Sequence, residues 1–457
     1  MHGVPMARKL QRGCEKRSVI PEIDPAGGTA SLDAARPSPL SSLKRFLRVL
    51  GPGLVTGASD DDPSGIGTYA IAGASFGFNT LWMALVTLPM MASVQYMCAK
   101  IGMVSGRGLA GVLKTHYPRS LVYVAVFALV VANSINAGAD IGAIAAGINL
   151  LVPIPIWSLI IPIALAVIAL QIWGSYRLIA NTFKWLTLAL LAYVFSAFFS
   201  KPGFAEVMRG TFVPNFPWNR TFLALTVGIL GTTISPYMFF WQSNQEVEEE
   251  IAAGRKTLQQ RKGATDAELK YAALDVNLGM LLSNIVMYFI ILSTAATLFK
   301  AGKTDIQSAT DAAQALRPLA GRAAEALLAI GLIGSGFLAV PILTGSSAYA
   351  VAEAFGWKHG FDKHPNRAKE FYGLVTISTL LGMLINFAGI NPIRALFWTA
   401  VINGFLAPPL LILILKISND RKIMGERANG RILNIAGWIT FAGMATAAVA
   451  LIVTWGQ

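Results

Sequence analysis

The chain has 457 residues, of which 54% are hydrophobic and only 13% are charged. Soluble domains carry about 25% charged residues, so this composition excludes an ordinary soluble protein and predicts an all-α polytopic membrane protein. The net charge of +13 would suggest a nucleic-acid partner in a soluble protein, but the positive-inside rule accounts for it here, and we expect no nucleic-acid partner.

Residues 1–45 are polar and rich in Pro, Gly, Ser and basic residues. No apolar run follows the first basic residues, so we expect a disordered basic cytoplasmic tail rather than a signal peptide. The rest of the chain, 46–457, predicts one transmembrane domain of eleven helices. The apolar segments lie at about 46–76, 79–103, 120–150, 154–173, 181–200, 221–243, 271–300, 323–352, 371–389, 392–416 and 432–454, with polar loops at 201–220 and 245–270.

The basic residues predict how these helices are oriented. Most of the 37 Lys and Arg residues fall in the tail and in the loops that follow even-numbered segments. Cytoplasmic loops carry the excess of Lys and Arg, so the N-terminus is expected in the cytoplasm and the C-terminus outside. We therefore expect an integral, multi-pass protein of a membrane such as the bacterial inner membrane.

The first apolar segment contains Ser59-Asp60-Asp61-Asp62-Pro63-Ser64-Gly65. Carboxylates at membrane depth cost about 2.5–3.5 kcal/mol each on insertion scales, and proline removes a backbone donor. The sequence therefore predicts a broken helix whose freed carbonyls and acids line an oxygen-rich cavity suited to a hard cation. The alternative is an aqueous loop that holds the acids between two short helices.

The sixth segment is interrupted in the same way. Gly228–Tyr237 places glycines, hydroxyl residues and Pro236 in the middle of an apolar run. Two breaks that are five segments apart predict a five-plus-five inverted repeat, at about 46–200 and 221–416, followed by an extra helix at 432–454. The alternative is ordinary, because prolines kink many membrane helices without binding anything.

Other polar residues inside the segments are weaker candidates. Asn133, Asn136 and Asp140 share one helix face, which suits either a functional site or a structural hydrogen-bond network. Asn403 lies next to Gly404 and before two prolines, and is a candidate site residue. A run of glutamates after the sixth segment, at positions 246 and 248–250, favours a solvated helix end over a vestibule that gathers cations.

With these residues in hand, the chain resembles the NRAMP family of divalent-metal transporters over about residues 45–455. Gly51-Pro52-Gly53 followed by Asp62-Pro63-Ser64-Gly65 is similar to that family's GPG and DPGN motifs, and Gly228–Tyr237 to its sixth-helix segment. The resemblance implies that Asp62 is the central carboxylate ligand. It also implies that Ser59 and Thr232 offer backbone carbonyls at the two breaks.

The chain departs from the family at several site positions. Gly65 stands where the family has a metal-binding Asn, Ser235 where it has a Met, and Tyr237 where it has a His. The family's Asp-x-x-Glu in the third helix becomes Asp140 and Ala143. The soft thioether ligand is therefore missing, as in the NRAMP-related magnesium transporters. The lost His and Glu also predict weak or absent proton coupling.

These observations predict a secondary transporter of divalent cations that works by alternating access, with Mg²⁺ and Mn²⁺ as the favoured ions and Fe²⁺ as a further candidate. The metal-site residues would be Asp62, Ser59, Thr232, Ser235 and Asn403, with Asp61, Asp60, Gly65, Asp140 and Tyr237 as secondary candidates. The expected partners are the divalent ion and the lipid bilayer, and we expect no cofactor.

The sequence also bears on two other function classes. An amino-acid or organic-solute transporter on the same inverted-repeat scaffold is the alternative, but three aspartates at the first break would repel a carboxylate substrate. An enzyme is not expected, because no predicted span contains a His and no nucleophile–base pair is evident in the spans.

Overall fold

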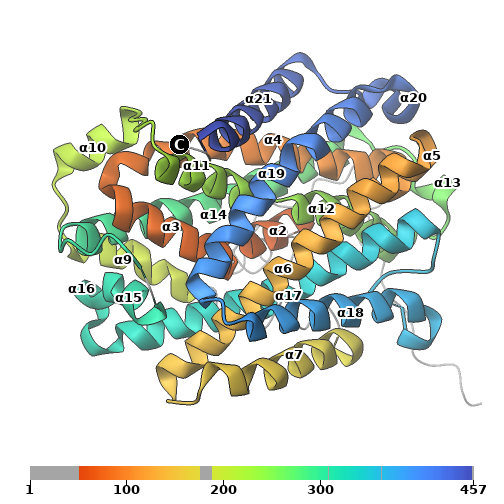
Figure 1. The fold of residues 1–457 in the computed structure, drawn as a ribbon. Coiled ribbons are helices and arrows are strands. Elements are labelled where there is room, and N and C mark those ends of the chain that lie inside the picture. Colours follow the sequence, from red (N-terminus) through yellow and green to blue (C-terminus); the bar gives the residue numbers. More distant parts are fainter. Residues whose placement is uncertain (1–50, 175–187, 307, 362, 455–457) are drawn as a thin grey trace, which may run out of the picture. The chain divides into compact units, whose positions relative to one another are not determined.

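The computed structural model describes residues 51–174, 188–306, 308–361 and 363–454. The predicted tail, the first residues of the first predicted span and those of the fifth lie outside this part of the chain. Within it the secondary structure is helical throughout, as predicted (Figure 1). The protein is thus an all-α polytopic membrane protein, and helices that are distant in sequence lie side by side around its centre.

The helices, with their bounds, follow in chain order. They are α2 (Pro52–Asp60), α3 (Pro63–Phe76), α4 (Trp82–Ser105), α5 (Leu109–His116), α6 (Arg119–Leu151), α7 (Ile156–Trp173), α9 (Ala192–Phe199), α10 (Phe204–Phe212), α11 (Arg220–Thr233), α12 (Pro236–Ala252), α13 (Leu258–Arg261), α14 (Asp266–Thr294), α15 (Ala309–Ala313), α16 (Arg317–Ala320), α17 (Ala324–Phe355), α18 (Lys369–Ile385), α19 (Pro392–Asn419), α20 (Arg421–Met424) and α21 (Arg431–Val453).

Nine helical stretches in the described ranges are long and apolar enough to cross a membrane, with α11 and α12 counted as one stretch. The predicted first and fifth spans are not among them. The first is divided into α2 and α3, and the fifth is described only from residue 188, where a short apolar helix covers 189–199. The exact count of eleven and the inverted repeat therefore stay predictions, whereas the broken first and sixth helices are confirmed.

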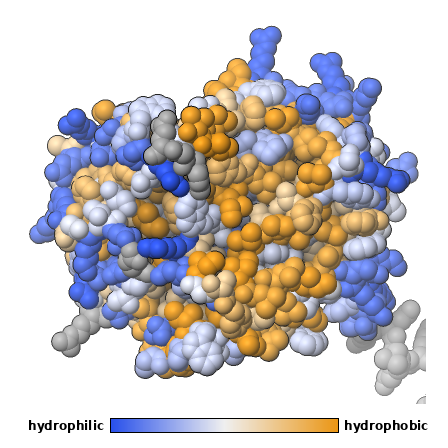
Figure 2. Space-filling model, in the orientation of Figure 1, coloured by the Kyte–Doolittle hydropathy of each residue, from blue (hydrophilic) through white to orange (hydrophobic). Residues whose placement is uncertain are grey.

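The surface matches a protein that is surrounded by lipid. Figure 2 shows apolar side chains across the middle of one face, between two edges where hydrophilic residues gather. Large apolar side chains are well exposed on helices that a soluble protein would not leave uncovered, such as Phe127 on α6, Leu165 on α7 and Ile439 on α21. Contiguous exposed apolar surface of this kind is typical of a membrane-embedded protein.

The short helix α2 is held by α14, which packs directly against its backbone. A Cβ added at Gly53 or Gly57 would lie only 2.6 or 2.3 Å from backbone atoms of α14, so only glycine allows this approach. The Asp275 carboxylate of α14 also accepts hydrogen bonds from Gly51 N (3.0 Å) and Gly53 N (2.6 Å). These amides open α2, where a helix has unpaired donors, so Asp275 caps α2 from another helix.

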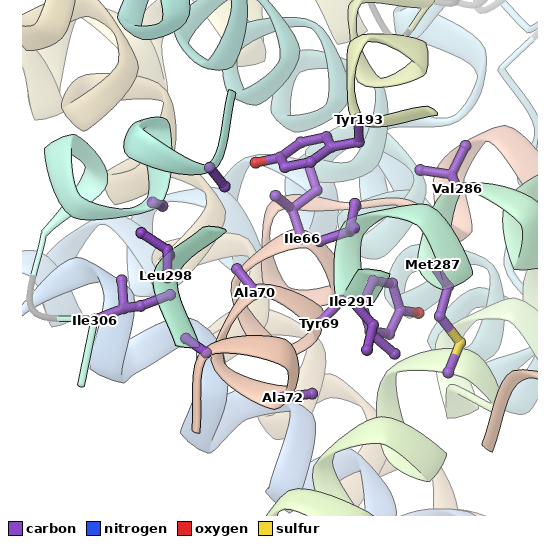
Figure 3. Close-up of a cluster of buried hydrophobic side chains, with 14 of the residues drawn as sticks. Ile66, Tyr69, Ala70, Ala72, Tyr193, Val286, Met287, Ile291, Leu298 and Ile306 are labelled. Carbon is purple, nitrogen blue, oxygen red and sulfur yellow. The ribbon is translucent and has the colours of Figure 1, made fainter. Parts of the chain in front are cut away.

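The second half of the broken helix, α3, is buried in an apolar cluster. Figure 3 shows Ile66, Tyr69 and Ala70 of α3 against Met287 and Ile291 of α14. All five side chains are at most 2% exposed. Because α14 contacts both α2 and α3, it fixes the two halves on either side of the break.

Two loop predictions were wrong. The loop predicted at 201–220 contains the helix α10, and the loop predicted from 245 begins only after α12 ends at Ala252. The predicted solvated end after the sixth helix is also wrong in part. Glu246 and Glu250 are each only 7% exposed, although Glu249 and the end of α12 at Ala252 are exposed.

Candidate functional site

The two breaks are built by the same local chemistry. In each, a residue with extended backbone precedes a proline that opens the next helix: Asp62 (ψ 166°) before Pro63, and Ser235 (ψ 136°) before Pro236. Proline excludes helical geometry at the preceding residue and suits the first position of a helix. Each Xaa-Pro pair therefore ends one helical half and starts the next.

Asp62 is the N-cap of α3 and is 1% exposed. One carboxylate oxygen accepts from Gly65 N (2.7 Å) and from Ser64 Oγ (2.7 Å), and the other accepts from Asn136 Nδ2 of α6 (3.2 Å). Hydrogen bonds and the positive end of a helix favour a negative charge. The structure thus holds one carboxylate, with defined partners, at the middle of the broken first helix.

Ser235 behaves differently from its counterpart. Its hydroxyl donates back to the carbonyls of Gly231 (2.6 Å) and Thr232 (2.9 Å), the last turn of α11. These carbonyls lose their helical partners where α11 ends. Ser235 therefore caps carbonyls that the predicted site would offer to a cation, and its own oxygen lies among them.

Direct contacts join the two breaks. Tyr237 Oη donates to the carbonyl of Ser59 (2.9 Å), and the Ser64 and Thr232 hydroxyls lie 3.5 Å apart. Ser59, Thr232 and Tyr237 are each at most 1% exposed. Ser64 and Tyr237 thus link the two breaks, and the Ser59 carbonyl already has the Tyr237 hydroxyl as a partner.

Gly65, where the resembled family has an Asn, faces this junction. A Cβ there would lie 3.2 Å from the Asp60 carbonyl, 3.3 Å from Thr232 Oγ1 and 3.3 Å from the Tyr69 ring. These distances are tighter than ordinary van der Waals contact. Neighbouring atoms therefore occupy the space that a side chain at position 65 would need. Gly65 contributes only its backbone amide.

Asp60 and Asp61 do not share the surroundings of Asp62. Ser283 Oγ of α14 lies 2.5 Å from Asp60 Oδ2 and 3.2 Å from Asp61 Oδ1. Asp62 instead contacts Asn136 of α6. The three consecutive acids therefore face two different helices, and of the three carboxylates only that of Asp62 bonds Ser64, whose hydroxyl lies near Thr232 at the second break.

The remaining candidates have weaker links to the site. Asp140 of α6 is fully buried and interacts electrostatically with Asp62 and with the backbone amide of Ser64, so it lies beside the first break. The Asn403 amide of α19 has no hydrogen-bond partner in the described part. Its neighbour Gly404 packs against Gly231, so α19 supports the end of α11, but no contact joins Asn403 to Asp62 among the described residues.

The sequence analysis placed Asn136 on a polar face of the third helix but did not include it among the site residues. Its spacing of four residues from Asp140 was the available signal, since such residues lie on one helix face. Ser64 lies inside the Asp62–Gly65 motif, whereas Ser283 had no such signal, because a single serine in an apolar helix is common.

Side chains of the usual metal-binding types do not converge on this site. Among the described residues, no group of three or more His, Cys, Asp or Glu side chains is placed to hold a metal ion. An ion at the breaks would therefore depend on one carboxylate together with carbonyl and hydroxyl oxygens. Such a ligand set suits hard cations, which keep part of their hydration shell.

The fold of the chain is similar to that of solved structures. The chain is similar to the Eremococcus coleocola manganese transporter in complex with an aromatic bis-isothiourea substituted compound, with a TM-score of 0.73, 18% identity, and coverage of 92% of this chain and 88% of that chain. A mutant of the same transporter gives a TM-score of 0.71 at 17% identity, covering 92% of this chain and 89% of that one. At these identities the likeness shows the fold.

More distant transporters share the same arrangement of helices. MhsT in complex with L-phenylalanine matches with a TM-score of 0.56 and 15% identity, covering 89% of this chain and 97% of that chain. The family model described as natural resistance-associated macrophage protein-like matches residues 53–454, which is most of the chain. The chain therefore belongs to the Nramp family, a family of membrane transporters and not of enzymes.

Proposed function

We propose that the protein is a secondary transporter that moves divalent metal cations by alternating access, and that the ion is held where the two broken helices meet. One observation carries this proposal. The buried Asp62 carboxylate lies at the first break, and the hydroxyl of its neighbour Ser64 reaches toward Thr232 at the second. Buried carboxylates in a membrane domain are retained for function, because they are costly to insert.

We further propose that the favoured ions are hard, with Mg²⁺ and Mn²⁺ ahead of Fe²⁺. The Asp62 carboxylate, the Ser59 and Thr232 carbonyls and the Ser235 hydroxyl are all oxygen ligands. Oxygen ligands give a softer ion no advantage over Mg²⁺. The similar Eremococcus coleocola protein is a manganese transporter, which supports Mn²⁺ as one of the ions.

Coupling to protons is proposed to be weak or absent. Tyr237 is bonded to the Ser59 carbonyl in place of the titratable His expected from the family, and Ala143 stands where a Glu was expected. Asp140 remains as a buried carboxylate near Asp62 and is one candidate for any residual coupling.

Uptake into proteoliposomes tests the proposal. The panel is Mg²⁺, Mn²⁺, Fe²⁺ and Ca²⁺, with internal pH recorded during uptake. Asp62→Asn should abolish uptake of every ion that the wild type carries, while Asp266→Asn, a change at a carboxylate that is 74% exposed, should leave it unchanged. Wild-type uptake by Asp62→Asn would refute the proposed site, and substrate-linked uptake of an amino acid would favour an organic-solute transporter.

A further inference from the structure

We propose that Asp60, Asp61, Ser283 and Tyr69 form a second cation-binding site, on the side of the first break that faces α14. The site would take a hard divalent cation. It adjoins the atoms around Asp62 but uses other side chains, and it does not require that Asp62 holds the transported ion.

The Asp60 and Asp61 carboxylates have few hydrogen-bond donors. Ser283 Oγ is within hydrogen-bond distance of both Asp60 Oδ2 (2.5 Å) and Asp61 Oδ1 (3.2 Å). A serine hydroxyl carries one proton, so it serves one carboxylate at a time. The other oxygen of Asp60, Oδ1, is buried with no hydrogen-bond partner in the described part of the protein. Two carboxylates therefore share a single donor.

The same two carboxylates are buried without a counter-charge. Asp60 is 0% and Asp61 5% exposed, and neither takes part in an ion pair found among the described residues. Buried charges in proteins are paired with opposite charges or bound to metal ions. The coulombic repulsion between adjacent carboxylates is strong in an interior of low dielectric constant. A divalent cation between them would balance the charge of both.

An independent observation points to the same place. Tyr69 of α3 is fully buried, and its hydroxyl has no hydrogen-bond partner within the described ranges. The phenol interacts electrostatically with Asp60 first, then with Asp61 and Asp62, and it also lies near the Thr232 side chain. Figure 3 shows the Tyr69 ring beside Met287 and Ile291 of α14, and Ser283 lies one helical turn before Met287. The phenol oxygen is thus a further donor that faces the α14 side of the break.

The donor set decides the class of ligand. Two carboxylates and two hydroxyls are all hard oxygen donors, which suit Mg²⁺, Mn²⁺ or Ca²⁺ better than softer metals. Mg²⁺ in particular is held by one or two carboxylates and keeps several waters. Asp62 is not part of this set, because its oxygens are bonded to Asn136 of α6 and to the first turn of α3.

Equilibrium binding of ⁵⁴Mn²⁺ to the full-length protein in nanodiscs tests the proposal. The wild type should bind two Mn²⁺ ions per chain. The double variant Asp60→Asn/Asp61→Asn should bind one, and Asp62→Asn should also bind one. Two ions retained by the double variant, or a wild type that binds only one ion and loses it with Asp62→Asn, would overturn the second site.

A milder variant guards against a failure to fold. Ser283→Ala removes only the shared hydroxyl and should weaken the second binding event at least tenfold while leaving the first unchanged. The matched control is Ser293→Ala, a fully buried serine of the same helix whose hydroxyl bonds Ser196 and the Ala315 carbonyl. Equal affinities in Ser283→Ala and wild type would refute the site. Loss of transport by Asp62→Asn with the second event intact would leave the proposed function standing.

Discussion

The bond from Tyr237 to the Ser59 carbonyl (2.9 Å) gives a test of whether that carbonyl binds the ion. Tyr237→Phe removes only the hydroxyl and leaves the buried carbonyl without this partner. An unsatisfied buried polar group costs about 1–3 kcal/mol, so we expect the ion-free variant to be destabilised by that amount. If the ion binds the freed carbonyl, the substitution destabilises the ion-bound protein less than the ion-free protein. Mn²⁺ should then bind more tightly. A difference of about 1.4 kcal/mol between the two states corresponds to about tenfold in affinity.

Isothermal titration with Mn²⁺, together with thermal unfolding with and without the ion, measures both effects. Tyr193→Phe is the matched control, because Tyr193 is 1% exposed and its hydroxyl has no hydrogen-bond partner in the described residues. It should change neither stability nor affinity by a comparable amount. Unchanged or weaker Mn²⁺ binding by Tyr237→Phe would refute the idea that the phenol and the ion compete for the Ser59 carbonyl.

Three further predictions follow from the same contacts. Ser235→Met introduces a thioether and should shift preference from Mg²⁺ toward Mn²⁺ and Cd²⁺ by about tenfold, measured by titration of the three ions. Asn136→Ala removes a donor to Asp62 and should slow Mn²⁺ uptake severalfold, whereas normal uptake would show that the bond is dispensable. Gly57→Ala places a Cβ 2.3 Å from a carbonyl of α14 and should lower the unfolding temperature in detergent by several degrees. Gly373→Ala, with no atom within 4 Å, should not.

The breaks could be predicted because their causes are local. Pro63 and Pro236 each restrict the residue before them, and this restriction is visible in the sequence alone. The position of Asp62 at the start of α3 follows directly, as does the run of hydroxyl residues near Thr232. For this part of the site, neighbours in sequence decide the structure.

Which helix the Asp60 and Asp61 side chains face could not be predicted in this way. Asp61 has dihedral angles between helix and strand (φ −82°, ψ 46°), so the side chains on either side of it turn to different helices. Their partners are decided by tertiary packing, since Ser283 lies 223 residues after Asp60. The burial of Glu246 is likewise not evident from its charge, although its hydrogen-bond partner lies only four residues earlier in α12. A charged helix end normally indicates solvent, but Gln242 donates to Glu246 (2.8 Å) inside the protein.

The cap on α2 has a consequence for how the protein is made. Asp275 is synthesised 222 residues after Gly53, and ribosomes add about 5–20 residues per second, so α2 exists for roughly ten seconds or more before its cap emerges. During that time α14 has not been made, so Asp60 and Asp61 lack the Ser283 hydroxyl that contacts them in the folded protein. We therefore expect the first span to complete its packing only after the seventh span has been made. Ribosome-bound chains that end before residue 266 should leave a cysteine placed at position 60, whose side chain contacts Ser283 of α14, open to a water-soluble thiol reagent, and chains that extend past α14 should protect it.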